Sequence, residues 1–443
     1  MYFAPNLVMS DKSYASNEYK RLGNRIRSNP QEISEEDYRI LQDLRLTYKE
    51  PLAIVFNAIE RAAYKVDSNC ICTYRVKRIE SIISKLIRFP HMQVNKAEDI
   101  AGCRCIMTST ENVYKLYNKL QRNKDKLPFE MTGAQHDYIA QPKDSGYQSI
   151  HLNVRLKGDK RVIEIQLRAL EHHNWATLVE ITDLLYRTKL KEYGQKSNPD
   201  LFDLHRLLSK DVQELTKEEM YRIADVAIAY NYVDTIGEVF ARNYLEVRSK
   251  WNKLKLQHYH FFLISTDTNG NPDFSGYLYF EEAERAYFNE FSNNRDNRNI
   301  VLTHLQKADF TKISIAYSNY FLTFNNTLTK VLLCLSEAVV NSYKRHQLSH
   351  FNRYHQASLN IVSFWINKQM LEIESFRRDR NVRNYLNVKT EWSYSIQHGL
   401  DALRSIFLNM HSRMTFDPLH AIPYYCMKRN RRKFLESLAM QKS

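Results

Sequence analysis

The sequence predicts an α+β fold, in which a β-sheet is flanked by helices and followed by a mostly helical C-terminal region with a small α/β module. Residues 137–168, DYIAQPKDSGYQSIHLNVRLKGDKRVIEIQLR, alternate between polar and apolar side chains with the period of two that is typical of strands. Before and after this stretch, apolar residues recur at helical spacing. The chain has 443 residues, enough for two or three domains with a buried core.

The two strands of residues 137–168 are expected to form a hairpin with its turn at residues 157–160. This register places Asn153 near Glu164, and His151 near Gln166. One face of the hairpin is then aliphatic and buried. The other face carries an unusual concentration of polar and aromatic groups beside a basic loop: Tyr147, Ser149, His151, Asn153, Glu164, Gln166 and Arg168. A solvated sheet face is the alternative interpretation of this polar side.

A second concentration of charge lies upstream, where a strand at residues 73–77 leads into a helix at residues 80–89. Arg75 and Lys77 share one face of this strand, Ser81 lies at the start of the helix, and Lys85 follows two turns into it. Two cations at a helix N-terminus are typical of a phosphate-binding corner. A solvated basic strand edge is the alternative, and these residues alone favour it.

Residues 98–107, EDIAGCRCIM, are expected to form a loop that enters another strand. Gly102 permits a close approach of the neighbouring backbone, and Asp99 could be a cap or turn residue. Cys103 and Cys105 alternate along the strand, so both should point inward. The six cysteines are too sparse for a disulfide scaffold, and their spacing does not suit a zinc site, which indicates a reducing cytoplasm.

Elsewhere the chain is expected to form helices at residues 34–48, 51–66, 114–123, 169–186 and 201–256, with a linker at residues 194–199. Strands are expected at 260–266, 299–305 and 312–317, a turn at 269–272 and a helix at 281–291. Residues from 347 onward should be helical up to a basic run at 428–433. The expected domains are a polar, helical extension (1–50), a first domain (51–195), helices with a small α/β module (200–345), and a helical region with a basic tail (346–443).

Four sequence motifs occur in the same order as in one known family. The motif PKxxGYQSIH, followed by EIQLR, with DIAGCR and Arg75-x-Lys77 upstream, is similar to the synthetase domain of the RelA/SpoT alarmone synthetases, over roughly residues 57–193. The resemblance implies a nucleotidyltransferase-like mixed β-sheet. It also implies transfer of the β,γ-diphosphate of ATP to the 3′-hydroxyl of GDP or GTP, which yields (p)ppGpp and AMP.

The resemblance assigns roles to the polar residues singled out above. On the ATP side, Asp99 and Glu164 match residues that hold Mg²⁺. The remaining ATP-side residues bind its phosphates or adenine: Lys77, Ser81, Lys85, Arg75 and Arg104.

On the acceptor side, Tyr147 would stack on guanine, Lys143 and His151 would contact phosphates, and Gln166 and Arg168 would orient their neighbours. Glu164 would also take or relay the proton of the 3′-hydroxyl. Without the family match, Tyr147 would be a packing aromatic residue and His151 an ordinary strand histidine.

Two departures from the family pattern bear on the activity, and the second leaves the acceptor open. The only His-Asp pair, His136–Asp137, lies inside the synthetase loop, so alarmone hydrolysis is not expected. Alarmone-making members often carry a lysine where this chain has His136, and His is mostly neutral at pH 7. The alternatives are therefore a toxin-type enzyme that pyrophosphorylates the 3′ end of tRNA or makes adenosine alarmones, and an inactive nucleotide-binding regulatory protein.

The composition bounds the partners. A net charge of +14 favours anionic partners, either nucleotides or tRNA. Residues 1–17 lack the features of a signal peptide. The most apolar run, residues 331–340, contains Glu337 and is shorter than the ~20 residues that a membrane span needs. A soluble protein without membrane contact is expected, and a homo-oligomer is compatible with the sequence.

Overall fold

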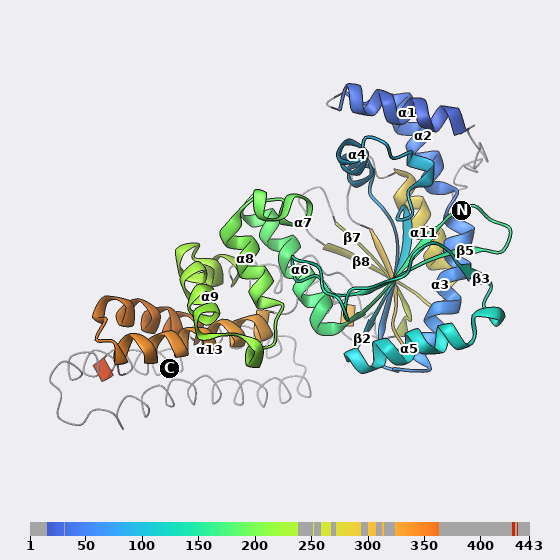
Figure 1. Ribbon diagram of the computed structural model, residues 1–443. Coiled ribbons are helices and arrows are strands. Elements are labelled where there is room, and N and C mark those ends of the chain that lie inside the picture. Colours follow the sequence, from blue (N-terminus) through green and yellow to red (C-terminus); the bar gives the residue numbers. More distant parts are fainter. Residues whose placement is uncertain are drawn as a thin grey trace. The chain divides into compact units, whose positions relative to one another are not determined.

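The computed structural model describes residues 16–30, 32–237, 251, 258–266, 272–293, 300–306, 312–313, 324–362, 428–429 and 432. The chain divides into two compact units. We call the first the sheet unit (residues 1–142, 148–173 and 253–317) and the second the helical unit (143–147, 174–252 and 318–443). Figure 1 shows the chain coloured along its sequence.

A nine-stranded sheet forms the centre of the sheet unit (Figure 1). Its strand order is β3-β5-β6-β2-β1-β9-β7-β8, and β4 pairs with β5. Strands β2 and β6 are parallel and the other pairs are antiparallel, so the sheet is mixed, as expected. The strands are β1 (Ile71–Val76), β2 (Ala101–Met107), β3 (Phe129–Met131), β4 (His136–Asp137), β5 (Ile150–Leu156), β6 (Ile163–Ala169), β7 (Phe261–Thr266), β8 (Pro272–Tyr277) and β9 (Val301–His304).

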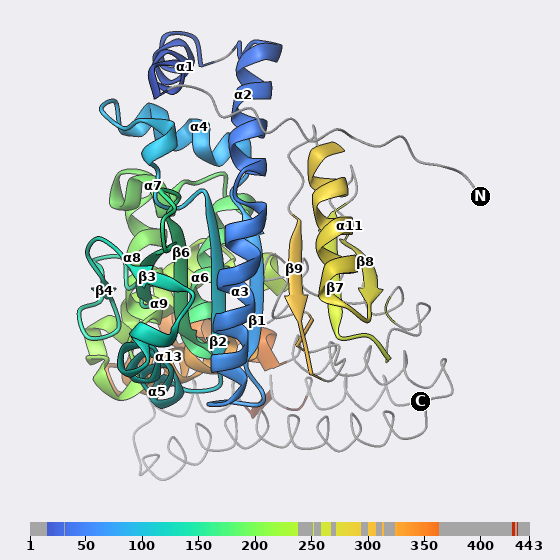
Figure 2. The ribbon, with the colours of Figure 1, turned by 90° about the vertical axis from the view of Figure 1, so that its right-hand side faces the viewer.

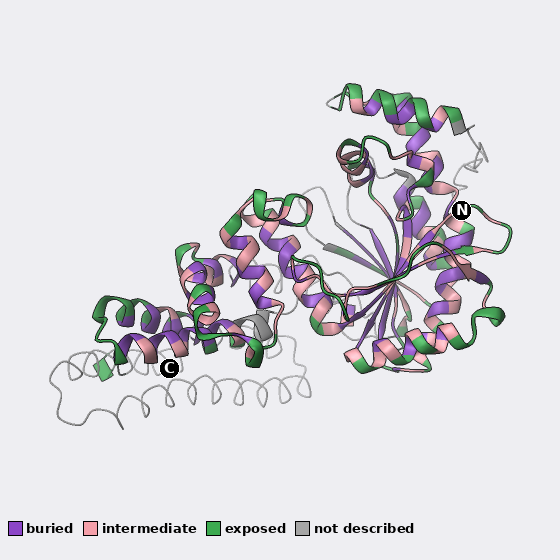
Figure 3. Cartoon of the chain, in the orientation of Figure 1, coloured by how far each residue is buried: buried purple, intermediate pink, exposed green. Residues whose placement is uncertain are grey.

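Three helices cover one face of this sheet: α3 (Lys49–Tyr64), α5 (Thr110–Arg122) and α11 (Phe280–Asn293) (Figure 2). Alternation along the strands supplies the apolar side chains of that face, which are buried (Figure 3). Tyr74 of β1 is fully buried there, with Phe56 of α3 and Tyr287 of α11 packed edge-on against its ring. The predicted inward orientation of Cys103 and Cys105 is confirmed, because both are buried free thiols.

The helices α1 (Ser16–Ser28), α2 (Glu35–Leu46) and α4 (Ile79–Arg88) contact one another. The Ser34 side chain caps α2 by accepting from the Asp37 N–H, as the predicted helix start requires. Two short 3₁₀ turns, η1 (Val94–Lys96) and η2 (Lys124–Lys126), complete the unit.

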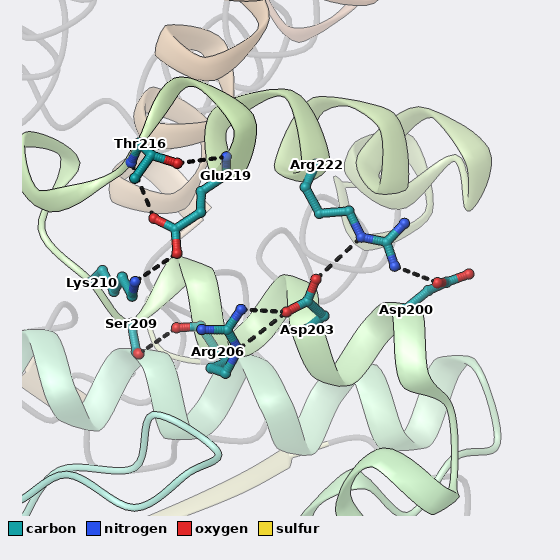
Figure 4. A network of polar contacts seen from close by, with 8 residues as sticks. All are labelled: Asp200, Asp203, Arg206, Ser209, Lys210, Thr216, Glu219 and Arg222. Atoms are coloured by element: carbon teal, nitrogen blue, oxygen red, sulfur yellow. Dashed lines mark hydrogen bonds and ion pairs between the residues drawn. The ribbon is translucent and has the colours of Figure 1, made fainter.

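The helical unit is built from α7 (Leu190–Tyr193), α8 (Pro199–Leu208), α9 (Lys217–Ala229) and α13 (Phe324–Lys344), together with most of α6 (Leu170–Leu185) and the turns η3 (Gly194–Lys196) and η4 (Val212–Glu214). Arg222 of α9 bonds Asp200 and Asp203 of α8, which ties these two helices together (Figure 4). Thr216 and Glu219 form a capping box at the start of α9.

The structure divides the chain differently from the expected domains. The stretch at residues 194–199 is not a linker, because Gly194 (φ +55°) packs against Phe202, and Asn198 caps α8. The strands β7 and β9 do not form a separate module, because β9 pairs with the free edge of β1 and so extends the same sheet. Strand β8 was not expected at all.

Other expectations fall wholly or partly outside the described residues. Lys312 and Ile313, expected to begin a strand, are helical. The remainder of that strand, most of the turn at 269–272, residues 363–427 and half of the basic run lie outside the described residues.

Candidate active site

Two lysines and one carboxylate meet where β1 ends and β2 begins. Lys77 Nζ lies 2.5 Å from Asp99 Oδ2, and Lys85 Nζ of α4 lies 2.8 Å from Asp99 Oδ1. The Lys77 N–H also donates to the Ile100 carbonyl oxygen at 2.7 Å, which joins the two chain segments. Burial opposes ionisation of Asp99, but the two lysines offset it, so the pKa of Asp99 is lowered. Burial lowers the pKa of Lys77.

A second cluster surrounds Glu164 on β6. His151 Nδ1 lies 2.8 Å from Glu164 Oε1, and Gln166 Nε2 donates to Oε2 at 2.6 Å. The side-chain oxygen of Gln166, Oε1, in turn accepts from Arg104 Nε at 3.3 Å and from Arg168 Nη2 at 3.0 Å. Burial would raise the pKa of Glu164, but His151, Gln166 and Arg168 lower it to about 2. Glu164 is therefore ionised at neutral pH.

Strand register explains why these side chains gather. Across β5, β6 and β2, His151 lies beside Gln166 and Gln166 beside Arg104, while Asn153 lies beside Glu164. The sequence-based prediction of both hairpin pairs is confirmed. Because partners in register point to the same side of a sheet, all of these residues share one face.

Gly102 lies between Glu164 on β6 and Arg75 on β1. A Cβ atom at Gly102 would lie 2.6 Å from the Glu164 carbonyl oxygen, so only glycine permits this approach. Arg75 is exposed, and Ser81 lies in the first turn of α4.

The two carboxylates expected to hold Mg²⁺ have separate partners in the structure. Ala101 lies beside Ile163 in the parallel pair β2–β6, so Asp99 and Glu164 belong to neighbouring chain segments. Asp99 contacts the lysines and Glu164 contacts His151 and Gln166. Among the described residues, no group of three or more His, Cys, Asp or Glu side chains could hold a metal ion. A shared metal site at the two carboxylates stays a prediction.

The loop that carries two of the expected acceptor residues, Lys143 and Tyr147, belongs to the helical unit. Lys143 Nζ lies 5.2 Å from the centre of the Tyr147 ring, and Trp175 of α6 lies edge-on to that ring at 6.5 Å. Gly146 has φ +88°, and a Cβ atom there would overlap Ser209. The loop is therefore seated closely on the end of α8.

Two groups near Glu164 and His151 were not singled out from the sequence. The Tyr138 ring lies edge-on to His151 at 5.3 Å and stacks on His136 at 5.4 Å. Glu98 Oε2 accepts from Asn153 Nδ2 at 2.8 Å. The alternation of His136 and Tyr138 in the sequence is a usable signal, but the two-residue strand β4 is too short to stand out by periodicity.

Comparison with known proteins finds a family that matches the stretch of chain in which most of these residues lie. Residues 74–191 match the family model described as "Region found in RelA / SpoT proteins". The chain is 34% identical over 128 residues to GTP pyrophosphokinase YjbM of Bacillus subtilis, covering 27% of this chain and 59% of that protein. It is 34% identical over 116 residues to GTP pyrophosphokinase YwaC of the same organism, covering 24% and 53%. The chain thus spans little more than half the length of these relatives.

A solved structure is also similar in sequence. The small alarmone synthetase 1 from Bacillus subtilis bound to its product pppGpp is 28% identical, over 40% of this chain and 90% of that one, with a TM-score of 0.30. The mixed sheet and its flanking helices define an α+β domain, with Lys77 and Lys85 gathered at Asp99 beside the end of β1. More specifically, residues 74–191 form a RelA/SpoT-family domain.

Proposed function

We propose that the protein is a (p)ppGpp synthetase, an ATP:GTP 3′-diphosphotransferase. The 3′-hydroxyl oxygen of GDP or GTP forms a bond to the β-phosphorus of ATP, the bond between the α,β-bridging oxygen and that phosphorus breaks, and AMP leaves. The observation that carries the proposal is the ionised Glu164, held by His151 and Gln166 on the charged sheet face within the family-matched residues. The relatives' name, GTP pyrophosphokinase, supports the same reaction.

Lys77 and Lys85 suit the ATP side of this reaction. Transfer of a phosphorus group requires cations that offset the charge on the moving group. Both ammonium groups are directed at one point, the Asp99 carboxylate. The phosphates of ATP would compete with Asp99 for them, while Arg75 and Arg104 would stack on adenine and Ser81 would donate at the start of α4.

The donor atoms at Asp99 and Glu164 fit Mg²⁺. Both are hard carboxylate oxygens with lowered pKa values, so both are available in the charged form that this ion prefers. When bound, the ion would neutralise charge on the transferred diphosphate.

On the acceptor side, Tyr147 would stack on guanine, and Lys143 and His151 would contact the acceptor phosphates. Glu164 would orient the 3′-hydroxyl and take its proton as the new bond forms. A carboxylate with a pKa of about 2 is a weak base, so Glu164 would relay the proton and not keep it. Gln166 and Arg168 would hold Glu164 in place.

The test is incubation of the full chain with Mg²⁺ and ATP labelled in its γ-phosphate, with GDP, GTP or deacylated tRNA as acceptor. We expect label on the guanosine nucleotides and an equal amount of AMP. Label on tRNA alone would contradict this acceptor and favour the toxin-type enzyme. No transfer to any acceptor would favour an inactive nucleotide-binding protein.

The second candidate, an enzyme that acts on tRNA or an adenosine nucleotide, has specific support. The net charge of +14 suits a polyanion, and His136, where related enzymes often have lysine, is exposed beside Tyr138.

The cellular setting is also a proposal. The described part of the chain contains no helix that could cross a membrane. Its five described cysteines are buried free thiols, as a reducing cytoplasm would maintain.

A further inference from the structure

Arg45 of α2 is a buried cation with an unusual set of partners. Only 5% of the residue is exposed, and burial lowers its pKa to about 10. Its Nε donates to the Lys77 carbonyl oxygen at 2.8 Å, and its guanidinium lies 3.9 Å from the centre of the Phe291 ring. Its Nη1 donates to the side-chain oxygen of Gln42, whose Nε2 donates to the Phe291 carbonyl oxygen. None of these partners is a carboxylate. Burying an arginine that is not paired with a carboxylate costs free energy, so the position of Arg45 calls for a structural explanation.

Helix α11 makes a second contact with the same end of β1. The Val76 N–H donates to the Tyr287 hydroxyl at 2.9 Å. Strand β9 pairs with β1 only over Cys72–Tyr74. Beyond this pairing, the Tyr287 hydroxyl is the hydrogen-bond acceptor for the backbone N–H of Val76. The hydroxyl is inaccessible to solvent because Tyr287 is fully buried.

The backbone of Lys77 is consequently fixed on both sides. Its N–H donates to the Ile100 carbonyl oxygen, and its carbonyl oxygen accepts from Arg45. A lysine side chain has four flexible bonds, so its ammonium group can be placed reproducibly only if the backbone that carries it is held. Ile100 follows Asp99, and the same clamp therefore sets the position of Asp99 relative to Lys77.

We infer that Arg45, Tyr287 and Phe291 are positioning residues for Lys77, and that α11 is part of the ATP-binding half of the site. This inference rests on the proposed function, because it requires Lys77 to contact the donor phosphates. Residues 280–293 lie outside the family-matched residues 74–191 and about 200 positions after Lys77 in the chain. A segment that looks separate in the sequence thus completes the site from the opposite face of the sheet.

The test is a double-mutant cycle that measures the affinity of the full chain for a non-hydrolysable ATP analogue with Mg²⁺, without an acceptor. We expect R45M to weaken analogue binding about tenfold in the unsubstituted chain and to have no further effect in K77M, because Arg45 acts through Lys77. Equal weakening by R45M in both backgrounds would overturn the inference, as would no weakening in either.

R161M is the matched control. Arg161 likewise donates to a backbone carbonyl oxygen, that of Thr47, and is paired with Asp159, but it touches neither Lys77 nor Asp99. Its affinity for the analogue should stay within about twofold of the unsubstituted chain.

If R45M does not fold by circular dichroism, Y287F replaces it in the same cycle. This variant removes only the hydroxyl that holds Val76.

The result is separable from the reaction itself. Analogue binding that depends on Arg45 through Lys77, in a chain that transfers label to no acceptor, would refute the proposed function and keep this inference. Transfer that is normal in R45M would overturn the inference and keep the function. A chain that binds no analogue would overturn both.

Discussion

The sheet unit and the helical unit hold their expected substrate-binding residues in different ways. In the sheet unit, Lys77 and Glu164 project from strands or strand ends, and each is fixed by contacts of 2.5–2.8 Å. In the helical unit, Lys143 and Tyr147 lie on a loop that packs against the end of α8. Ser209 leaves no room there for a side chain at position 146. The residues proposed to contact ATP therefore belong to the sheet unit. Of the residues proposed for the acceptor, Lys143 and Tyr147 depend on a loop conformation, whereas His151, Gln166 and Arg168 project from β5 and β6 of the sheet unit.

The largest expected effect is that of Glu164→Gln. The substitution is nearly isosteric but removes the charge and the proton acceptor, so transfer should fall by roughly 1000-fold or more. The circular dichroism spectrum should stay unchanged. Asp159→Asn is the control, because it also removes a paired carboxylate from the β5–β6 hairpin. Transfer by Glu164→Gln within tenfold of the unsubstituted chain would remove Glu164 from the chemistry.

Lys85→Met should separate the two halves of the site. Loss of a charged hydrogen-bond donor costs about 1.5–3 kcal/mol, so affinity for an ATP analogue should fall by roughly 10–150-fold. Acceptor affinity, measured by calorimetry with GDP, should not change. Lys115→Met is the control, since Lys115 forms an exposed ion pair with Glu111 on α5. Equal losses of ATP-analogue and acceptor affinity would contradict the assignment of Lys85 to ATP.

Tyr147→Ala is the converse experiment. Loss of a base–aromatic stack should weaken acceptor binding by ~1–3 kcal/mol and leave the affinity for the ATP analogue unchanged. The control is Tyr193→Ala. Like Tyr147, Tyr193 lies in the helical unit with a lysine ammonium over its ring, since Lys189 Nζ lies 5.9 Å from the ring centre. Unaltered acceptor affinity in Tyr147→Ala would show that its assigned role is wrong.

The smallest effect concerns acid stability of the helical unit. Burial lowers the pKa of His205 from 6.5 to about 3. Between pH 6.5 and 3 the His205 side chain is therefore protonated in the unfolded chain but neutral in the folded chain. The contribution of His205 to the free energy of unfolding is complete above pH 6.5 and is lost as the pH falls toward 3. From pH 7.5 to 5 the His205 contribution should fall by about 2 kcal/mol.

Urea unfolding of the full chain at both pH values, with His205→Gln as comparison, measures this contribution. The variant should lose about 2 kcal/mol less than the unsubstituted chain over this range. An identical pH dependence in the two proteins would refute the assignment. Glu164 in the sheet unit acts only at lower pH, because its pKa moves from 4.5 to about 2.

The sequence is most informative where local patterns decide the structure. The hairpin register follows from strict alternation around a turn that contains Gly158 (φ +86°), and both predicted cross-strand pairs are confirmed. The close approach at Gly102 is confirmed for the same reason, since a glycine in a strand is a local signal.

Contacts between segments far apart in the chain could not be predicted from the sequence. Periodicity identifies β9 as a strand but does not name β1 as its partner, so the extension of the sheet was missed. Nothing in the residues around Tyr147 reveals that the loop packs on Ser209, some sixty positions later. The contact of Arg45 with Lys77 depends on three separate segments meeting in space, and no spacing rule encodes it.

The central claim is that Asp99 and Glu164 share one divalent ion when ATP is bound. A crystal structure of the full chain with a non-hydrolysable ATP analogue and Mn²⁺, which marks the Mg²⁺ position by anomalous scattering, tests it directly. We predict one anomalous peak bonded to both carboxylates, with Lys77 and Lys85 moved from Asp99 to the phosphates. A metal bound away from either carboxylate, or Asp99 still paired with both lysines, would contradict the account.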